Sequence, residues 1–356
     1  MTPAALLAVA LAASQRHAFT EIHMGVPVRV TICAEDPQAA AEAARGAFDI
    51  MHAWDQALSD WNPTSDAMQL PSKAGQTTMV QGRLALALTA SAQWHERTGG
   101  AFDAAMGPIV RLWRDAVRRD AWPTDDEVAV ARAASGWDGL RWDPAGSSVT
   151  MLRDGVRLDF GGIGQGLAAD EAQRWLRSRG FNHSMVDVSG DIAIGDPPPG
   201  EAGWRIEIEP AFDGQPPETL LLSRCGVSCS GDRGQPRNVG GRPISHIVDP
   251  ADGRPVAVPR QAVVVASTAT AADTLATAMC VLTPDRCASL VAHGHAEAAR
   301  ASRSDSDGGI QAIGRWNSIT RAPSAPACAP SASEGSRPSQ APAAAGSIDP
   351  SSPAPR

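Results

Sequence analysis

The chain has 356 residues, 43% of them hydrophobic, which is enough for one large domain or two ordinary domains with buried cores. Its formal net charge is −8, so the sequence lacks the basic surface that nucleic-acid-binding domains use. A phosphate-rich ligand would therefore need a local device for binding, such as a metal ion or a set of backbone amides.

The six cysteines do not predict a metal site. No two of them form a CxxC pair, and no histidine stands at a metal-ligand spacing from them. Cys225 and Cys229 are candidates for a disulfide in an oxidising compartment, and the favoured alternative is that they are small buried or half-buried thiols.

The two ends of the chain differ in composition from its middle. Residues 4–13 (AALLAVALAA) resemble the apolar part of a secretory signal, so we assign residues 1–18 to a leader segment. No Lys or Arg precedes this run, and it is too short to span a bilayer as a helix. The leader favours a periplasmic or other extracytoplasmic location, with a cytoplasmic location as the alternative. Residues 318–356 are mainly Ser, Pro and Ala and predict a disordered tail.

The predicted elements between these ends are short strands and amphipathic helices. The stretch PVRVTIC alternates apolar and polar residues and predicts a strand at 27–33 with Val28, Val30 and Ile32 inward. Asp36 caps the helix that follows it. The patterns then predict helices at 37–58, 82–97 and within 123–140, a hairpin at 147–160, a helix at 167–179, strands at 183–188, 191–195, 204–209 and 262–266, and helices at 270–282 and after Thr283. This order indicates a single mixed α+β domain over residues 19–317.

A glycine-rich turn stands between a predicted strand and a helix, in the segment LDFGGIGQGLAAD (158–170). Its glycines let the backbone approach a ligand at the start of a helix, where free N–H groups and the helix dipole favour phosphate. The segment lacks both the spacing of a Rossmann fingerprint and the GK[ST] of a P-loop. A purely structural turn is the alternative.

The segment ATAADTLATA (269–278) places Asp273 and Thr277 four residues apart, so on a helix they share one face. A carboxylate and a hydroxyl are both hard oxygen ligands that suit Mg²⁺. The alternative is a helix with a solvated Asp273 and a Thr277 that bonds back to its own backbone.

Two further segments combine turns with polar side chains. In SHIVDPADGRPV (245–256), His246 and Asp249 flank an apolar pair next to tight turns. In TGGAFDAAMGPIVRLW (98–113), a Gly-Gly pair and an Asp precede an apolar helix. Taken singly, these segments are also compatible with an ordinary histidine and an ordinary loop.

In their order along the chain, these segments resemble the FAD:protein FMN transferase family, also called ApbE-like and formerly thiamine-biosynthesis lipoproteins. The resemblance runs from about Phe19 to residue 316. Its further matches are FTEIHMG, LSDWNPTSDAMQL, VDVSGDIAIGD and GVSCSGD. The order of these matches makes a chance resemblance improbable.

The resemblance implies a set of site residues. It implies that Asp273, Thr277 and the backbone oxygens of Gly162 and Ala276 hold Mg²⁺. It implies a catalytic role for His246 in proton transfer or phosphate stabilisation, with Asp249 orienting its turn. The residues that it places around FAD are Met24, Trp61, Ala101, Phe102, Asp103, Asp159, Gln165 and Ile247.

The implied reaction moves FMN from FAD onto a Thr or Ser of an acceptor protein as a phosphoester and releases AMP. The implied acceptors are flavin subunits of membrane redox complexes of the Nqr/Rnf type. The alternatives are an FAD pyrophosphatase that yields FMN and AMP, and a non-catalytic flavin-binding or scavenging protein. The sequence departs from the family pattern at Gln165, where Lys is common, at Trp61, where Tyr is usual, and at Ser189, where the pattern has Gly.

Overall fold

The computed structural model describes residues 14–211, 217–232, 237–256, 260–303 and 309–322. The expected leader up to residue 13 and the expected tail from residue 323 lie outside these residues. The first strand begins at Gln15, so residues 15–18, which the leader assignment includes, belong to the folded chain. At the other end, the Leu221 backbone N–H donates to the Thr320 carbonyl, and Arg321 pairs with Glu218. The folded chain therefore also extends past the expected boundary at residue 317.

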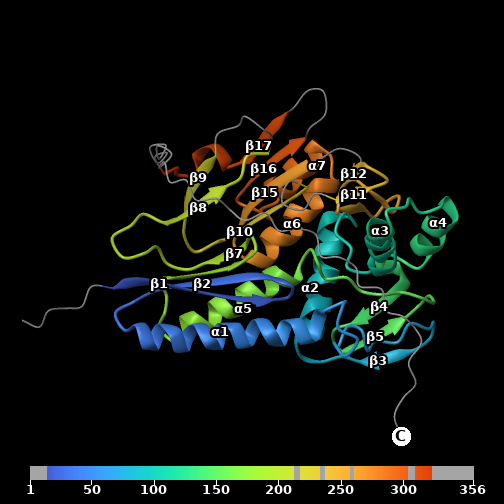
Figure 1. Ribbon diagram of the computed structural model, residues 1–356, viewed down its shortest axis with the longest axis horizontal. Helices are drawn as coiled ribbons and strands as arrows, with labels where there is room; N and C mark the ends of the chain where they lie inside the picture. The colour runs from blue at the N-terminus through green and yellow to red at the C-terminus, as the bar shows by residue number, and fades with distance from the viewer. Residues whose placement is uncertain (1–13, 212–216, 233–236, 257–259, 304–308, 323–356) are drawn as a thin grey trace, which may run out of the picture. The chain divides into compact units, whose positions relative to one another are not determined.

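The core of the domain is an eight-stranded sheet in which every pair of neighbouring strands is antiparallel (Figure 1). In order across the sheet, the strands are β1 (Gln15–His23), β2 (Val26–Ala34), β6 (Ser184–Val188), β7 (Asp191–Ile194), β10 (Gly226–Gly231), β15 (Arg260–Ala266), β16 (Ala298–Arg303) and β17 (Ile310–Gly314). Because the sheet contains strands from both halves of the sequence, it joins them into one unit.

Three helices pack against one face of the sheet: α1 (Pro37–Leu58), α5 (Gly164–Ser178) and α6 (Ala269–Val281). Val28, Val30 and Ile32 are fully buried in the main core beneath them, which confirms the inward face predicted for this strand. The Asp36 carboxylate accepts a 2.8 Å hydrogen bond from the Gln38 backbone N–H, as expected for the cap of α1.

A two-stranded hairpin packs against the other face of the sheet. It consists of β8 (Trp204–Ile208) and β9 (Glu218–Leu222), whose apolar side chains form a second core. The buried strand β15 separates the two cores, because Val264 lies in the main core whereas Val263 and Val265 lie in the second. A strand buried on both faces explains the continuous apolar run of this segment.

The remaining elements border this sheet and its helices. The helices α3 (Gly107–Arg119) and α4 (Asp125–Ala133) form a third apolar cluster with Val239. None of the helices among the described residues is long and apolar enough to cross a membrane. The remaining helices and strands are α2 (Gly82–Thr98), α3 (Gly107–Arg119), α4 (Asp125–Ala133), α7 (Pro284–Ala292), β3 (Thr77–Met79), β4 (Leu140–Asp143), β5 (Ser148–Met151), β11 (Arg237–Val239), β12 (Arg242–Ile244), β13 (Val248–Asp249) and β14 (Arg254–Pro255), with 3-10 turns η1 (Trp137–Gly139) and η2 (Trp316–Ser318).

The hairpin predicted at 147–160 is wrong. Strand β5 pairs with β4 and β3 instead, and residues 156–160 belong to no strand. The Asp159 backbone N–H donates to the Ala104 carbonyl at 2.8 Å, so this segment lies against the 98–113 loop. Its alternating pattern reflects the burial of Val156, Leu158 and Phe160, which needs no strand pairing.

No disulfide joins Cys225 and Cys229. Cys225 is buried, as the alternative to a disulfide predicted, whereas Cys229 is exposed. Cys328 lies outside the described residues.

Helices α5 and α6 meet at an unusually short distance between their backbones. A Cβ atom on Gly166 would lie 2.7 Å from the Ala269 carbonyl oxygen and from the Thr270 Cα. The Asp170 carboxylate accepts hydrogen bonds from the backbone N–H groups of Ala269 and Thr270, both at 2.9 Å. These contacts fix the first turn of α6 against α5 and thereby orient Asp273.

We expect Asp170→Ala to lower the free energy of unfolding by about 2 kcal/mol, because it leaves two N–H groups at the start of α6 without their acceptor. Asp170→Asn keeps one acceptor oxygen and should lose less. Chemical denaturation monitored by circular dichroism measures both values. Equal stability of Asp170→Ala and wild type would show that this anchor contributes nothing.

Candidate active site

Two adjacent cavities lie where α6, the glycine-rich turn and the 245–256 segment meet. We call them the nucleotide cavity, of about 230 Å³, and the acidic cavity, of about 450 Å³. Both are lined by Gly161, Gln165, His246 and Thr277, so these four residues form their common border. The nucleotide cavity contains six of the eight residues predicted to surround FAD, which are Ala101, Phe102, Asp103, Asp159, Gln165 and Ile247.

The proposed metal ligands converge at this border. Asp273 is only 3% exposed and lines the acidic cavity, so the solvated-aspartate alternative is wrong. Its Oδ2 accepts a 3.0 Å hydrogen bond from the Gly166 backbone N–H. The Thr277 hydroxyl lies 3.4 Å from the Ser230 hydroxyl, and a Cβ on Gly162 would lie 3.0 Å from Thr277 Oγ1. Ala276 is fully buried beside them on α6.

The electrostatics of the acidic cavity favour a cation. Burial raises the pKa of Asp273 well above its usual value, and the neighbouring carboxylate of Asp191 raises it further. Burial also raises the pKa of Asp191 to about 7, although the Ser228 hydroxyl donates a 2.6 Å hydrogen bond to it. A divalent cation would offset the cost of ionising both groups.

The donor set fits Mg²⁺. It comprises one carboxylate, one hydroxyl and backbone carbonyls, all of them hard oxygen ligands. No group of three or more His, Cys, Asp or Glu side chains able to hold a metal occurs among the described residues. A site with a single carboxylate and several neutral oxygens is consistent with that finding.

His246 lies beside Asp232, a residue that no sequence pattern marked as part of the site. His246 Nδ1 is 3.5 Å from Asp232 Oδ1, and the Ser245 hydroxyl donates a 2.5 Å hydrogen bond to the same oxygen. Burial opposes ionisation of Asp232, but contacts with His246 and Ser245 lower its pKa overall. The Asp249 carboxylate instead accepts from the Ala251 backbone N–H at 2.9 Å and so stabilises its own turn.

Arg114 on α3 connects two of the residues predicted to surround FAD. Its guanidinium donates a 2.9 Å hydrogen bond to Asp159 and lies 5.4 Å from the centre of the Trp61 ring. It also pairs with Asp60. Trp61 is 66% exposed, so the part of its ring that Arg114 does not cover is accessible to a ligand. Arg114 thus places a positive charge in the nucleotide cavity.

Met24 occupies a different position from the other predicted FAD residues. Its backbone has a φ of 52°, in the left-handed region, and its side chain packs against the main core. A Cβ on Gly164 would lie 3.6 Å from Met24 Cε, which places this methionine at the start of α5.

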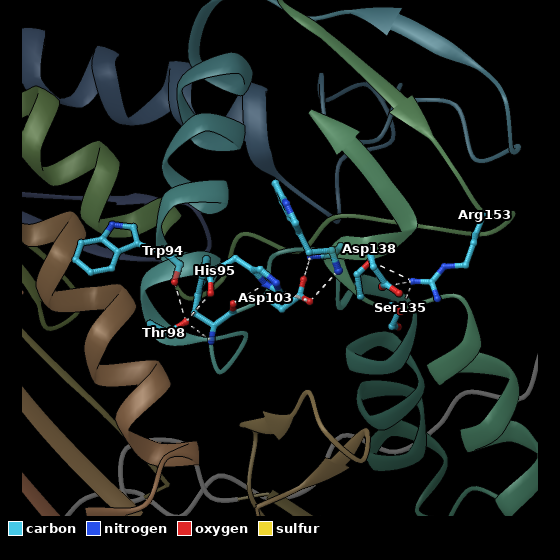
Figure 2. Close-up of polar contacts among 11 residues, drawn as sticks. Trp94, His95, Thr98, Asp103, Ser135, Asp138 and Arg153 are labelled. Atoms are coloured by element: carbon cyan, nitrogen blue, oxygen red, sulfur yellow. Dashed lines mark hydrogen bonds and ion pairs between the residues drawn. The ribbon is translucent and has the colours of Figure 1, made fainter. Parts of the chain in front are cut away.

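A hydrogen-bond network holds Asp103 in place (Figure 2). Its carboxylate accepts from the backbone N–H groups of Ala105, at 2.7 Å, and Trp137, at 2.8 Å, while His95 Nδ1 lies 3.6 Å away. Burial raises the pKa of Asp103, and these hydrogen bonds oppose the rise. The network therefore fixes the carboxylate without help from a ligand.

Asp103 also borders a third cavity, of about 580 Å³, which we call the arginine cavity. It adjoins the nucleotide cavity through Ala101, Asp103 and Met106. Three arginines line it, which are Arg132, Arg153 and Arg286, together with the aspartates Asp103, Asp138 and Asp249.

The contact between His246 and Asp232 leads to a prediction. Asp232→Asn removes the charge that orients the His246 ring, so we expect a fall in kcat of about tenfold or more for any reaction in which His246 moves a proton. The KM for the nucleotide should change little, because Asp232 does not line the nucleotide cavity. Asp249→Asn is the matched control and should retain most of kcat. If Asp249→Asn lost more kcat than Asp232→Asn, Asp249 and not Asp232 would be the residue that orients His246.

Comparison with known proteins gives a consistent result. The model of the ApbE family matches residues 24–300. The FAD:protein FMN transferase of Klebsiella pneumoniae (strain 342) is 28% identical over 277 residues, which cover 75% of this chain and 79% of that protein. That of Treponema pallidum (strain Nichols) is 29% identical over 280 residues, covering 74% and 77%.

Solved structures share the fold. The apo form of the flavinyl transferase ApbE from Pseudomonas stutzeri is 26% identical, with a TM-score of 0.73 over 87% of this chain and 98% of that chain. The flavin transferase ApbE from Vibrio cholerae has a TM-score of 0.76 at 21% identity, over 86% and 100% of the two chains. The α+β fold and the resemblance inferred from the sequence are both confirmed. The family match spans most of the described domain, and the chain belongs to the ApbE family.

Proposed function

We propose that this protein is a Mg²⁺-dependent FAD:protein FMN transferase. It would move FMN from FAD onto a Thr or Ser of an acceptor protein as a phosphoester and release AMP. The observation that carries the proposal is that buried Asp273 lines the acidic cavity, while the half-buried residues Thr277 and His246 line both cavities. The names of the curated relatives support the same activity.

The chain's own residues suit each requirement of this reaction. With Nδ1 directed toward Asp232, His246 keeps Nε2 free to accept the proton of the acceptor hydroxyl. The hydroxyl oxygen then bonds to the phosphorus of FMN while the bond from that phosphorus to the AMP oxygen breaks. Mg²⁺ held by Asp273, Thr277 and the carbonyls of Gly162 and Ala276 would neutralise charge on the pyrophosphate.

Two of the three departures from the family pattern, Gln165 and Trp61, concern binding of the nucleotide, whereas the third, Ser189, lines the acidic cavity. Gln165 lines both cavities, so replacing the common Lys removes a positive charge near the pyrophosphate. Arg114 and Arg237 line the nucleotide cavity and supply positive charge there. Trp61 can stack on a flavin or adenine ring in place of the usual Tyr. We therefore propose that these departures change the degree of activity and not its kind.

The acceptor and its compartment belong to the same proposal. We propose flavin subunits of membrane redox complexes of the Nqr/Rnf type as acceptors, and a site of action outside the cytoplasm. The direct test incubates the protein with FAD, Mg²⁺ and such a subunit and measures covalent FMN on the subunit by intact mass. Release of free FMN and AMP regardless of the acceptor would instead indicate an FAD pyrophosphatase.

Asp273→Ala separates catalysis from binding. We expect FMN transfer to fall by about a hundredfold or more, because the metal loses its one carboxylate ligand and with it the stabilisation of charge at the phosphorus. FAD affinity should fall only partly, since stacking on Trp61 does not depend on that charge. Asp285→Ala, which removes an exposed carboxylate on α7, is the control and should behave as wild type.

Two results would contradict the assignment. Transfer by Asp273→Ala at the wild-type rate and with the wild-type Mg²⁺ dependence would place the metal elsewhere. A wild-type protein that binds FAD tightly, yet neither transfers FMN nor cleaves FAD, would be a flavin-binding or scavenging protein.

A further inference from the structure

Charge is distributed unequally among the three cavities. The acidic cavity is lined by Asp187, Asp191, Glu207, Glu209 and Asp273, and no Lys or Arg lines it in the described part of the chain. The nucleotide and arginine cavities together carry five arginines, which are Arg114, Arg132, Arg153, Arg237 and Arg286, and four aspartates, which are Asp103, Asp138, Asp159 and Asp249. The border residues His246 and Thr277 therefore lie between a side of mixed charge and a side whose charged Asp and Glu residues have no Lys or Arg beside them in the cavity lining.

This distribution assigns the two reactants to different sides, provided that the proposed transferase function holds. FAD carries two negative phosphate groups, so Coulomb repulsion disfavours the acidic cavity and leaves for FAD the side that carries the arginines. The acidic cavity is left for the second reactant, the polypeptide that brings the hydroxyl. Its volume of about 450 Å³ is within the range of sites that enclose a ligand.

The wall of the acidic cavity includes a strand edge. Strand β10 pairs with β15 along its whole length, from Gly226 to Gly231. Within the described chain, its pairing with β7 covers only Gly226 and Val227. Residues 228–231 thus border the cavity without a β7 partner, and an extended peptide can add to such an edge through main-chain hydrogen bonds.

The geometry of this edge matches the position of the proposed chemistry. The Ser230 hydroxyl lies 3.4 Å from the Thr277 hydroxyl, so a peptide beside residues 228–231 passes the end of the metal site. Glu207 and Glu209 line the same cavity and are exposed, whereas Ile206 and Ile208 of the same segment are buried in the second core. Both glutamate side chains are therefore accessible from solvent.

We propose that the acidic cavity is the docking site for the acceptor protein. An extended acceptor segment would lie beside residues 228–231 with its Ser or Thr hydroxyl at His246. Glu207 and Glu209 would select a Lys or Arg close to that hydroxyl. Alternate residues of a strand share a face, so the favoured position of the basic residue is two residues from the Ser or Thr.

The test uses two synthetic peptides that differ at one position, with Lys or Glu two residues from a single Thr among Gly and Ala. Fluorescence anisotropy of labelled peptides gives their affinity for the FAD-loaded protein with Mg²⁺, and mass spectrometry detects FMN on the Thr. We expect wild type to bind the Lys peptide about tenfold more tightly or better. The double variant Glu207→Lys with Glu209→Lys should reverse this preference and keep the Kd for FAD within about twofold.

Two further variants serve as controls for the effect of the double variant on peptide binding. Glu42→Lys changes an exposed glutamate on α1 and should leave the peptide preference unchanged. Cys229 lines the acidic cavity, so Cys229→Trp should obstruct it and weaken binding of both peptides while FAD still binds.

The outcomes separate this inference from the proposed function. Failure of wild type to bind either peptide, or an unchanged preference in the double variant, would overturn the docking site. A large loss of FAD affinity in the double variant would show that the acidic cavity holds the nucleotide, which also overturns it. Charge-dependent peptide binding without FMN on the Thr would support the docking site and contradict the transferase function.

Discussion

The site depends on how closely the glycine-rich turn and α5 approach α6. Gly162 lies against the Thr277 side chain, and Gly166 lies against the backbone of Ala269 and Thr270. At 2.7 Å from backbone atoms, a Cβ on Gly166 would force the two helices apart. The same approach lets the Gly166 N–H donate to Asp273, which keeps that carboxylate buried and oriented. The pattern of the glycine-rich turn is weak evidence for a site, but the close approach that it allows is required for the arrangement of the proposed metal ligands.

Where the glycine-rich turn meets α6, the burial of carboxylates is electrostatically unfavourable. Two carboxylates, Asp191 and Asp273, are buried here, and burial raises the pKa of both; the charge of Asp191 raises the pKa of Asp273 further, and the charge of Asp187 raises that of Asp191. Such an arrangement destabilises a folded chain unless a cation compensates, and it is typical of a functional site. The border between an arginine-bearing side and an acidic side further separates a nucleotide from a polypeptide reactant. Burial, charge and cavity shape thus all favour binding of FAD on one side of the border and of the acceptor polypeptide on the other.

Much of the fold follows from local patterns. The alternation of Val28, Val30 and Ile32 and the cap at Asp36 predicted a strand and a helix that the structure contains. Six predicted FAD residues also fall in one cavity, because the motifs that carry them lie on loops that the sheet brings together. The incorrectly predicted hairpin shows the limit of such patterns. Apolar and polar residues alternate at 156–160 because the apolar side chains are buried, although this segment pairs with no strand.

The residues that local patterns missed act across long separations. Asp232 contacts His246, which is 14 residues later in the sequence, and Arg114 contacts Asp159, which is 45 residues later. Neither pairing leaves a periodic signal, because each depends on how loops from different elements pack. The segment GVSCSGD contained Asp232, but only the position of its carboxylate beside the imidazole suggests its role.

The central claim is that Asp273 and Thr277 hold a divalent cation at the border of the two cavities. Its most direct test is an anomalous diffraction measurement on crystals soaked with FAD and Mn²⁺, which takes the oxygen ligands of Mg²⁺ and scatters anomalously. The account predicts one strong peak about 2.1–2.3 Å from an Asp273 carboxylate oxygen and from Thr277 Oγ1. A peak bound by Asp187 and Asp191 without Asp273, or no ordered Mn²⁺ beside bound FAD, would contradict it.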